Sequence, residues 1–167
     1  MNASWLWIFP ALLFVASIGA AVVPRSKKKF CSGLAICAMG VAFLLSCAAF
    51  SSALGDGPGG HGTGFRAVAN FDWLSLGKGA IRLGWVLDPL SAVMLVMVTF
   101  VGFWIFVFSA GYMEHDERYG RFFCFLSLFA AAMLGLVISN SLLLLFMFWE
   151  VVGLASYLLI GFWFHKE

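Results

Sequence analysis

Apolar residues fall into five long runs along the chain, and polar stretches separate the runs. A helix needs about 20 apolar residues to cross the roughly 30 Å core of a bilayer, and each run comes close to that length. The pattern therefore predicts five membrane-spanning helices, over residues 5–23, 30–54, 89–112, 122–138 and 142–163. Pro24 ends the first run, and Ser139 with Asn140 predicts a tight turn between the fourth and the fifth.

Residues 70–86, between the second and third runs, change to the pattern of strands. The segments FDWLSL and AIRLGWV are rich in aromatic and branched residues, and they flank a Gly-Lys-Gly turn at 77–79. This predicts a β-hairpin, with an irregular loop as the alternative. Because a lone hairpin is marginal in water, we expect it to lie on the outer face of this protein or of a neighbour, with Trp73 and Trp85 at the membrane interface. The glycine-rich stretch 55–64 predicts a flexible external loop.

The composition agrees with a membrane protein and changes little else. Of the 167 residues, 63% are hydrophobic and 11% are charged, more apolar surface than a soluble domain of this size can bury. We therefore expect an all-α integral membrane protein of about five transmembrane helices with a short external hairpin. The four cysteines form no CxxC pair and lie in or beside apolar runs, which favours packing over zinc or disulfide chemistry: Cys31, Cys37, Cys47 and Cys124.

Lysine and arginine in the loops predict the orientation. If the N-terminus lies outside, the inner loops hold seven basic residues: Arg25, Lys27, Lys28, Lys29, Arg118, Arg121 and Lys166. The outer stretch holds three: Arg66, Lys78 and Arg82. We therefore expect the N-terminus outside and the C-terminus inside, which in a bacterium means an inner-membrane protein with a periplasmic N-terminus and a cytoplasmic C-terminus. The expected divisions are 1–54, with the first two helices, 55–88, with the external loop and hairpin, and 89–167, with the last three helices.

Glu150 is the single charged residue inside an expected span. A carboxyl group near mid-membrane is costly and is by default a functional-site hypothesis. Phe146 and Met147 precede it by one helical turn, and the small residues Gly153, Ala155 and Ser156 follow it, with Tyr157 two turns on. A carboxyl group beside a small gap is suited to reversible protonation. The alternative is a protonated structural glutamate that hydrogen-bonds a neighbouring helix.

Other polar residues have structural and functional interpretations side by side. Asp88 and Pro89 form a typical helix start, in which Asp caps free N–H groups and Pro fits the first helical position, although Asp88 could also serve an outer proton exit. His115 and His165 lie at the expected inner interface, as proton relays or as ordinary interfacial polar residues. The mixed charges of 113–121 indicate a solvated face or a docking surface for another subunit. We find no catalytic nucleophile set, haem-type histidine pair or nucleotide-binding fingerprint.

The helical sequences resemble a known family of membrane subunits. The segments that carry the resemblance are WVLDPLSAVMLVMVTFVGFWIFVFSAGYM (85–113) and YGRFFCFLSLFAAAMLGLVISNSLLLLFMFWEVVGLASYLLIGFWF (119–164). With the hairpin before them, they are similar to the N-terminal part of subunit L (chain 5) of the proton-pumping NADH–quinone oxidoreductase, respiratory complex I. Four motifs are together quite specific: the helix start DPLS, the helix end SxGYM, the run FF-x-F-x-x-LF and the run WE-x-VG-x-x-SYLLIGFW.

The resemblance implies a membrane-arm subunit with no redox cofactor of its own. NADH and quinone are used by other subunits, and no nucleic acid is involved. The family's key glutamate on its fifth helix falls on Glu150, and its partner there is a lysine on a broken seventh helix. The expected partners are therefore the bilayer, other membrane-arm subunits, and either the missing remainder of the same subunit or a completing chain.

The chain stops where that family continues, and it lacks the broken helix with its lysine. We expect a fragment, with a truncated gene model or a split subunit as alternatives. Two other functions stay open. One is a subunit of a cation/proton antiporter or a membrane hydrogenase, which neighbouring genes would reveal. The other is a scaffold that transports nothing, which an intact pump after Glu150→Gln would favour.

Overall fold

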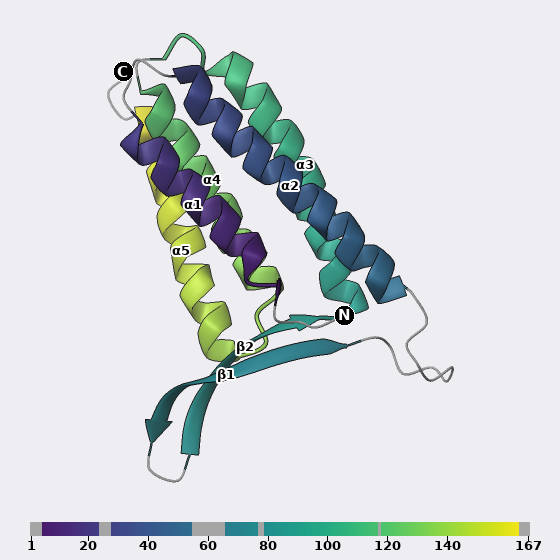
Figure 1. The fold of residues 1–167 in the computed structure, drawn as a ribbon. Coiled ribbons are helices and arrows are strands. Elements are labelled where there is room, and N and C mark those ends of the chain that lie inside the picture. Colours follow the sequence, from purple (N-terminus) through teal and green to yellow (C-terminus); the bar gives the residue numbers. More distant parts are fainter. Residues whose placement is uncertain (1–4, 24–27, 55–65, 77–78, 117, 164–167) are drawn as a thin grey trace.

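In the residues that the structure describes, the fold is a bundle of five α-helices with one two-stranded hairpin across one end (Figure 1). It comes from a computed structural model, which describes residues 5–23, 28–54, 66–76, 79–116 and 118–163. The helices are α1 (Ile8–Val22), α2 (Lys28–Leu54), α3 (Pro89–Tyr112), α4 (Tyr119–Val137) and α5 (Leu142–Ile160), with a 3₁₀ turn at Gly161–Trp163. The strands are β1 (Ala67–Leu76) and β2 (Gly79–Leu87). The expected flexible loop at 55–64 lies outside the described residues.

Among the described ranges, four helical segments are long and apolar enough to cross a bilayer: Lys29–Ala53, Pro89–Tyr112, Tyr119–Val137 and Leu142–Trp163. The expected all-α membrane fold is therefore confirmed, with one correction. The first helix, α1, has only 15 residues, about 22 Å of rise, instead of the full 5–23 span. Trp5–Trp7 form a turn before it, in which the Phe9 N–H donates to the Leu6 carbonyl at 3.2 Å.

The helices alternate in direction, so the bundle has a hairpin end and an opposite end (Figure 1). At the hairpin end, α1, α3 and α5 begin and α2 and α4 finish. At the opposite end, α1, α3 and α5 finish and α2 and α4 begin. We use these two names below for the two ends.

The helices pack in pairs: α1 on α4, α2 on α3, and α4 on α5. Because lipid is as apolar as leucine, close packing and hydrogen bonds hold such helices together in a membrane. The Ser17 hydroxyl on α1 donates to the Cys124 carbonyl on α4 at 2.9 Å. On α5, the Phe148 ring lies where a side chain at Gly135 of α4 would be, so only glycine allows this approach.

The predicted hairpin is confirmed, and it is tied to the bundle. Its antiparallel register pairs Ala67 with Leu87 and Leu76 with Gly79, with an irregularity between Asp72 and Leu74. The Val86 N–H donates to the Ile138 carbonyl at 2.8 Å, and the Asn140 N–H donates to the Gly84 carbonyl at 2.9 Å. The turn between α4 and α5 therefore holds β2.

The two hairpin tryptophans have different surroundings. The Trp73 side chain is exposed, and its expected place at the membrane interface stays a prediction. The Trp85 ring is half-buried instead, and it lies 6.0 Å from the Phe148 ring of α5, measured between ring centroids. Trp85 thus joins the hairpin to α5 because β2 is anchored beside the start of that helix.

The start of α3 follows the sequence prediction to the residue. The Ser91 N–H donates to the Asp88 carboxylate at 2.6 Å, and Pro89 occupies the first turn. The helix start interpretation of Asp88 is therefore confirmed. The Ser141 hydroxyl caps α5 in the same way, since it accepts from the Leu144 N–H at 3.2 Å.

Candidate functional site

Glu150 lies near the middle of α5, on the outer surface of the bundle. It is the ninth of the 19 residues of α5, which places it about 12 Å along the helix from Leu142. Its side chain is exposed, as are those of Phe146, Met147 and Trp149 around it. Within the described part of the chain, no side chain pairs or hydrogen-bonds with Glu150. The carboxyl group thus faces away from the four other helices.

The whole outer side of α5 is unusually open. Of the four long apolar helical segments found among the described residues, the one that contains α5 is the least buried inside the bundle. Its buried residues are Leu144 and Ala155, which turn toward the rest of the protein. The other side therefore faces either lipid or protein that lies beyond the described residues.

The expected small-residue patch beside Glu150 is only partly present. Successive residues of a helix are about 100° apart, so Gly153 and Ala155 point about 200° apart. Accordingly Gly153 is exposed, Ala155 is fully buried and Ser156 is half-buried. A side chain at Gly153 would meet nothing within 4 Å. Glu150 therefore lies beside an open surface at Gly153 and not beside a gap enclosed within this chain.

Tyr157 shares the side of α5 that carries Glu150. Seven residues, almost two full turns, separate the two, which corresponds to about 10 Å along the axis toward the opposite end. The Tyr157 side chain is 74% exposed and lines a crevice between the start of α4 and the end of α5. Tyr157 therefore provides a hydroxyl group between Glu150 and the opposite end of the bundle.

The remaining predicted site residues are not brought to Glu150. Asp88 is at the hairpin end, where its carboxylate caps α3. His115 is exposed in the turn after α3, at the opposite end. His165 lies outside the described residues. Within 5–163, less the gaps in the description, no three residues among His, Cys, Asp and Glu gather as metal ligands would.

The structure also contains polar groups that the sequence reasoning missed. The Ser46 and Thr99 hydroxyls lie 2.8 Å apart between α2 and α3, and Thr99 also donates to the Leu95 carbonyl at 2.6 Å. Ser127 on α4 is fully buried, and its hydroxyl has no partner among the described residues. The signal for Thr99 was a lone hydroxyl residue in the middle of an apolar helix, which predicts a contact between helices.

Comparison with known proteins identifies related sequences over most of the chain. Residues 73–123 match the family model described as NADH-Ubiquinone oxidoreductase (complex I), chain 5 N-terminus. Residues 139–167 match the model described as NADH:quinone oxidoreductase/Mrp antiporter, TM. The second match includes Glu150 and the whole of α5.

Individual relatives agree with these matches. The chain is 36% identical to the chloroplastic NAD(P)H-quinone oxidoreductase subunit 5 of Angiopteris evecta, over 96% of this chain and 21% of the relative. It is 40% identical to that of Marchantia polymorpha, over 96% of this chain and 23% of the relative. It is 53% identical to that of Anthoceros angustus over 58% of this chain and 13% of the relative. The chain thus spans less than a quarter of the length of each of these three curated relatives.

Proposed function

Because the chain belongs to the family of subunit 5 of the NAD(P)H-quinone oxidoreductases, we propose that it is part of a proton-translocating membrane subunit of such a complex. In this proposal Glu150 takes up and releases protons near the middle of the membrane. Electron transfer from NADH to quinone takes place in other subunits. It moves charge along the membrane arm, and a cation near Glu150 then comes closer or moves away, so that the carboxyl group loses or gains its proton.

The position of Glu150 on the outside of the bundle is the observation that carries this proposal. A carboxyl group at the middle of a span is costly when it faces lipid, and such groups almost always face protein or water inside an assembly. Glu150 is exposed in the middle of α5, on the open side of the least buried long apolar helix. A structural glutamate that hydrogen-bonds within these helices would have a partner among them. In the described residues none is present, which favours a partner supplied from elsewhere.

We propose that further chain of the same subunit, or a separate completing chain, covers the part of the open side of α5 that carries Glu150. The relatives are more than four times as long as this chain, so their subunits contain much additional protein. The family resemblance implies that the additional part of the subunit supplies a lysine near Glu150. A cation at that place would favour the ionised carboxylate, and its departure would favour the protonated form.

The proposed route to Glu150 runs along the open side of α5 from the opposite end. Tyr157 and the half-buried Ser156 offer hydroxyl groups between that end and Glu150. Arg118 and Arg121 lie at that end, whereas Arg82 lies on the hairpin. By the distribution of basic residues, we propose that the opposite end faces the inner, proton-supplying side and that the N-terminus lies outside. Asp88 needs no part in this route because its carboxylate caps α3.

A second function shares the same site. The family model that covers 139–167 describes both NADH:quinone oxidoreductases and Mrp antiporters, so a subunit of a cation/proton antiporter is the alternative. The two functions differ in the ions that bind to the Glu150 carboxyl group. A quinone oxidoreductase subunit would bind protons there, whereas an antiporter site would also bind a cation such as Na⁺ in exchange for protons.

An apolar carbodiimide tests the proposed protonation directly, because it reacts with protonated carboxyl groups that it reaches through the membrane. We expect Glu150 to be modified in membranes that contain the assembled complex, and Glu114, an exposed carboxylate after α3, to remain unmodified. Modification should fall as pH rises and should not respond to Na⁺. Protection by Na⁺ at constant pH would favour the antiporter, and equal modification of Glu114 and Glu150 would contradict a membrane-embedded protonated group.

A further inference from the structure

A basic crevice opens at the opposite end of the bundle, between the start of α4 and the end of α5. Its volume is about 500 Å³, within the range of small-molecule sites. Arg118, Arg121 and Tyr157 provide its polar lining, and Phe125 and Phe162 provide part of its apolar lining. The crevice therefore joins two cationic groups to an apolar wall.

The two arginines present their charges to this crevice. The Arg118 guanidinium lies 5.4 Å from the centre of the Phe162 ring, which holds the half-buried side chain in place. Arg121 is exposed. In the described ranges neither guanidinium forms an ion pair. The carboxylate of Asp116 is engaged, since it accepts from the Arg118 backbone N–H at 2.7 Å and from Trp163 Nε1 at 3.0 Å. Both guanidinium groups can therefore bind an anion.

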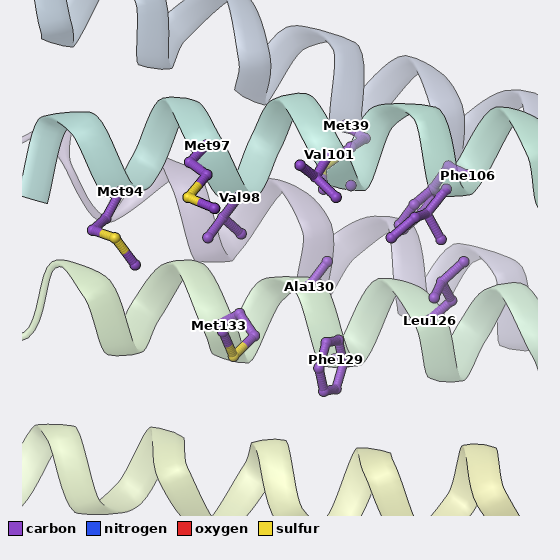
Figure 2. A pocket seen from close by; sticks show the side chains of 12 residues that line it. Met39, Met94, Met97, Val98, Val101, Phe106, Leu126, Phe129, Ala130 and Met133 are labelled. Atoms are coloured by element: carbon purple, nitrogen blue, oxygen red, sulfur yellow. The ribbon is translucent and has the colours of Figure 1, made fainter.

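An apolar groove of about 290 Å³ lies farther along α4, between α4 and α3. Figure 2 shows the residues that line it, with Met94, Met97 and Val101 on α3 and Phe129 and Met133 on α4. Met39 of α2 lies behind them. Methionine side chains are flexible and adapt to irregular partners, so this lining suits a flexible apolar chain better than a fixed side chain.

Two neighbouring residues on the surface of α4 belong to the two sites. Phe125 lines the crevice, and Phe129, four residues later, lines the groove. Residues four apart lie above one another on a helix. From Arg121 the distance along the axis is about 12 Å to Phe129 and about 18 Å to Met133. One leaflet of a bilayer has an apolar depth of about 15 Å, so an acyl chain that starts beside Arg121 reaches the groove.

We propose that the crevice and the groove together bind one anionic phospholipid. The phosphate receives hydrogen bonds from the guanidinium groups of Arg118 and Arg121, which suit phosphate oxygens. One acyl chain follows Phe125 and Phe129 into the groove between α3 and α4. Two cations over a crevice, with an apolar groove one helical turn farther along α4, match a headgroup and its chain, as basic pockets between transmembrane helices do elsewhere.

Photocrosslinking tests this site in membranes that contain the assembled protein. The probe is phosphatidylglycerol with a diazirine midway along one acyl chain, and phosphatidylcholine with the same chain is the comparison. We expect phosphatidylglycerol to label peptides from 94–105 and 126–133 several-fold more than phosphatidylcholine does. The double variant Arg118→Gln/Arg121→Gln should lower this labelling several-fold. The matched control Arg66→Gln/Arg82→Gln removes two exposed charges near the hairpin and should leave it unchanged.

A third variant separates chain binding from headgroup binding. Val101→Trp fills the groove from an exposed position, so it should reduce labelling of 126–133 while assembly, measured by the amount of complex, stays normal. Equal labelling by both lipids, or labelling that survives loss of both arginines, would show ordinary lipid contact and overturn the proposal. Absence of label from both peptides in the assembled complex would also overturn it, because protein would then cover the groove.

Discussion

Replacing Glu150 with glutamine is expected to abolish most proton pumping while the protein still assembles. Glutamine has nearly the same size and keeps a polar end, but its amide group cannot take up and release a proton near neutral pH. Proton transfer by a positioned group typically contributes two or more orders of magnitude, so we expect the pumping rate to fall by roughly a hundredfold or more. The measurement is acidification of inverted membrane vesicles driven by NADH, with quinone reduction recorded in the same sample.

Two further variants make this result specific. Glu150→Asp keeps a carboxyl group on a shorter side chain, so it should retain part of the pumping. Glu114→Gln removes an exposed carboxylate after α3 and should leave pumping normal. If Glu150→Gln pumps as well as the unaltered protein and assembles normally, the helices act as a scaffold and Glu150 is not the proton carrier.

Replacing Gly135 with alanine is expected to destabilise the bundle by about 1–3 kcal/mol, the usual cost of adding atoms to a packed interior. The new methyl group would overlap the Phe148 ring of α5. That ring cannot move freely, because its centroid lies 6.0 Å from that of Trp85 and 6.5 Å from that of Phe14. The change therefore strains the packing of α1, α4, α5 and the hairpin together.

Denaturing-detergent titrations, with helix content followed by circular dichroism, measure this effect. Gly33→Ala is the matched control, because a side chain there would meet nothing within 4 Å, and its effect should stay within about 0.5 kcal/mol. Phe148→Leu shortens the obstructing side chain, so the double variant should be more stable than the sum of the single changes predicts, by about 1 kcal/mol. Strict additivity would contradict the proposed contact.

Local signals in the sequence predicted much of the fold. The bounds of α3 were predicted correctly because Asp88 and Pro89 determine its start through neighbouring backbone groups. The hairpin was predicted from its Gly-Lys-Gly turn between two runs rich in aromatic and branched residues. The start of α4 was expected at 122 but lies at Tyr119. The first turn of the helix comes before the apolar run, and it forms because one of its sides packs on the rest of the protein. Tyr119 is itself buried.

Contacts between distant segments could not be predicted from the sequence. The apolar runs of α1 to α5 are alike, so nothing in them indicates that α1 packs on α4 or that Phe148 fills the space at Gly135. Glu150 was predicted as a site residue because it is a charged residue in an apolar run. Only the structure shows that its side chain is exposed on the outside of the bundle. The grouping of Gly153 with Ala155 was wrong for a simpler reason, since their helical angles already place them apart.

The most direct test of Glu150 as a proton carrier is infrared difference spectroscopy of the assembled complex, with and without NADH. A protonated carboxyl group has a carbonyl stretching band that an ionised carboxylate lacks, and the band shifts with its surroundings. We predict such a band that changes on addition of NADH and is missing in Glu150→Gln. A difference spectrum that is the same in the unaltered protein and in Glu150→Gln would contradict a role of Glu150 in carrying protons.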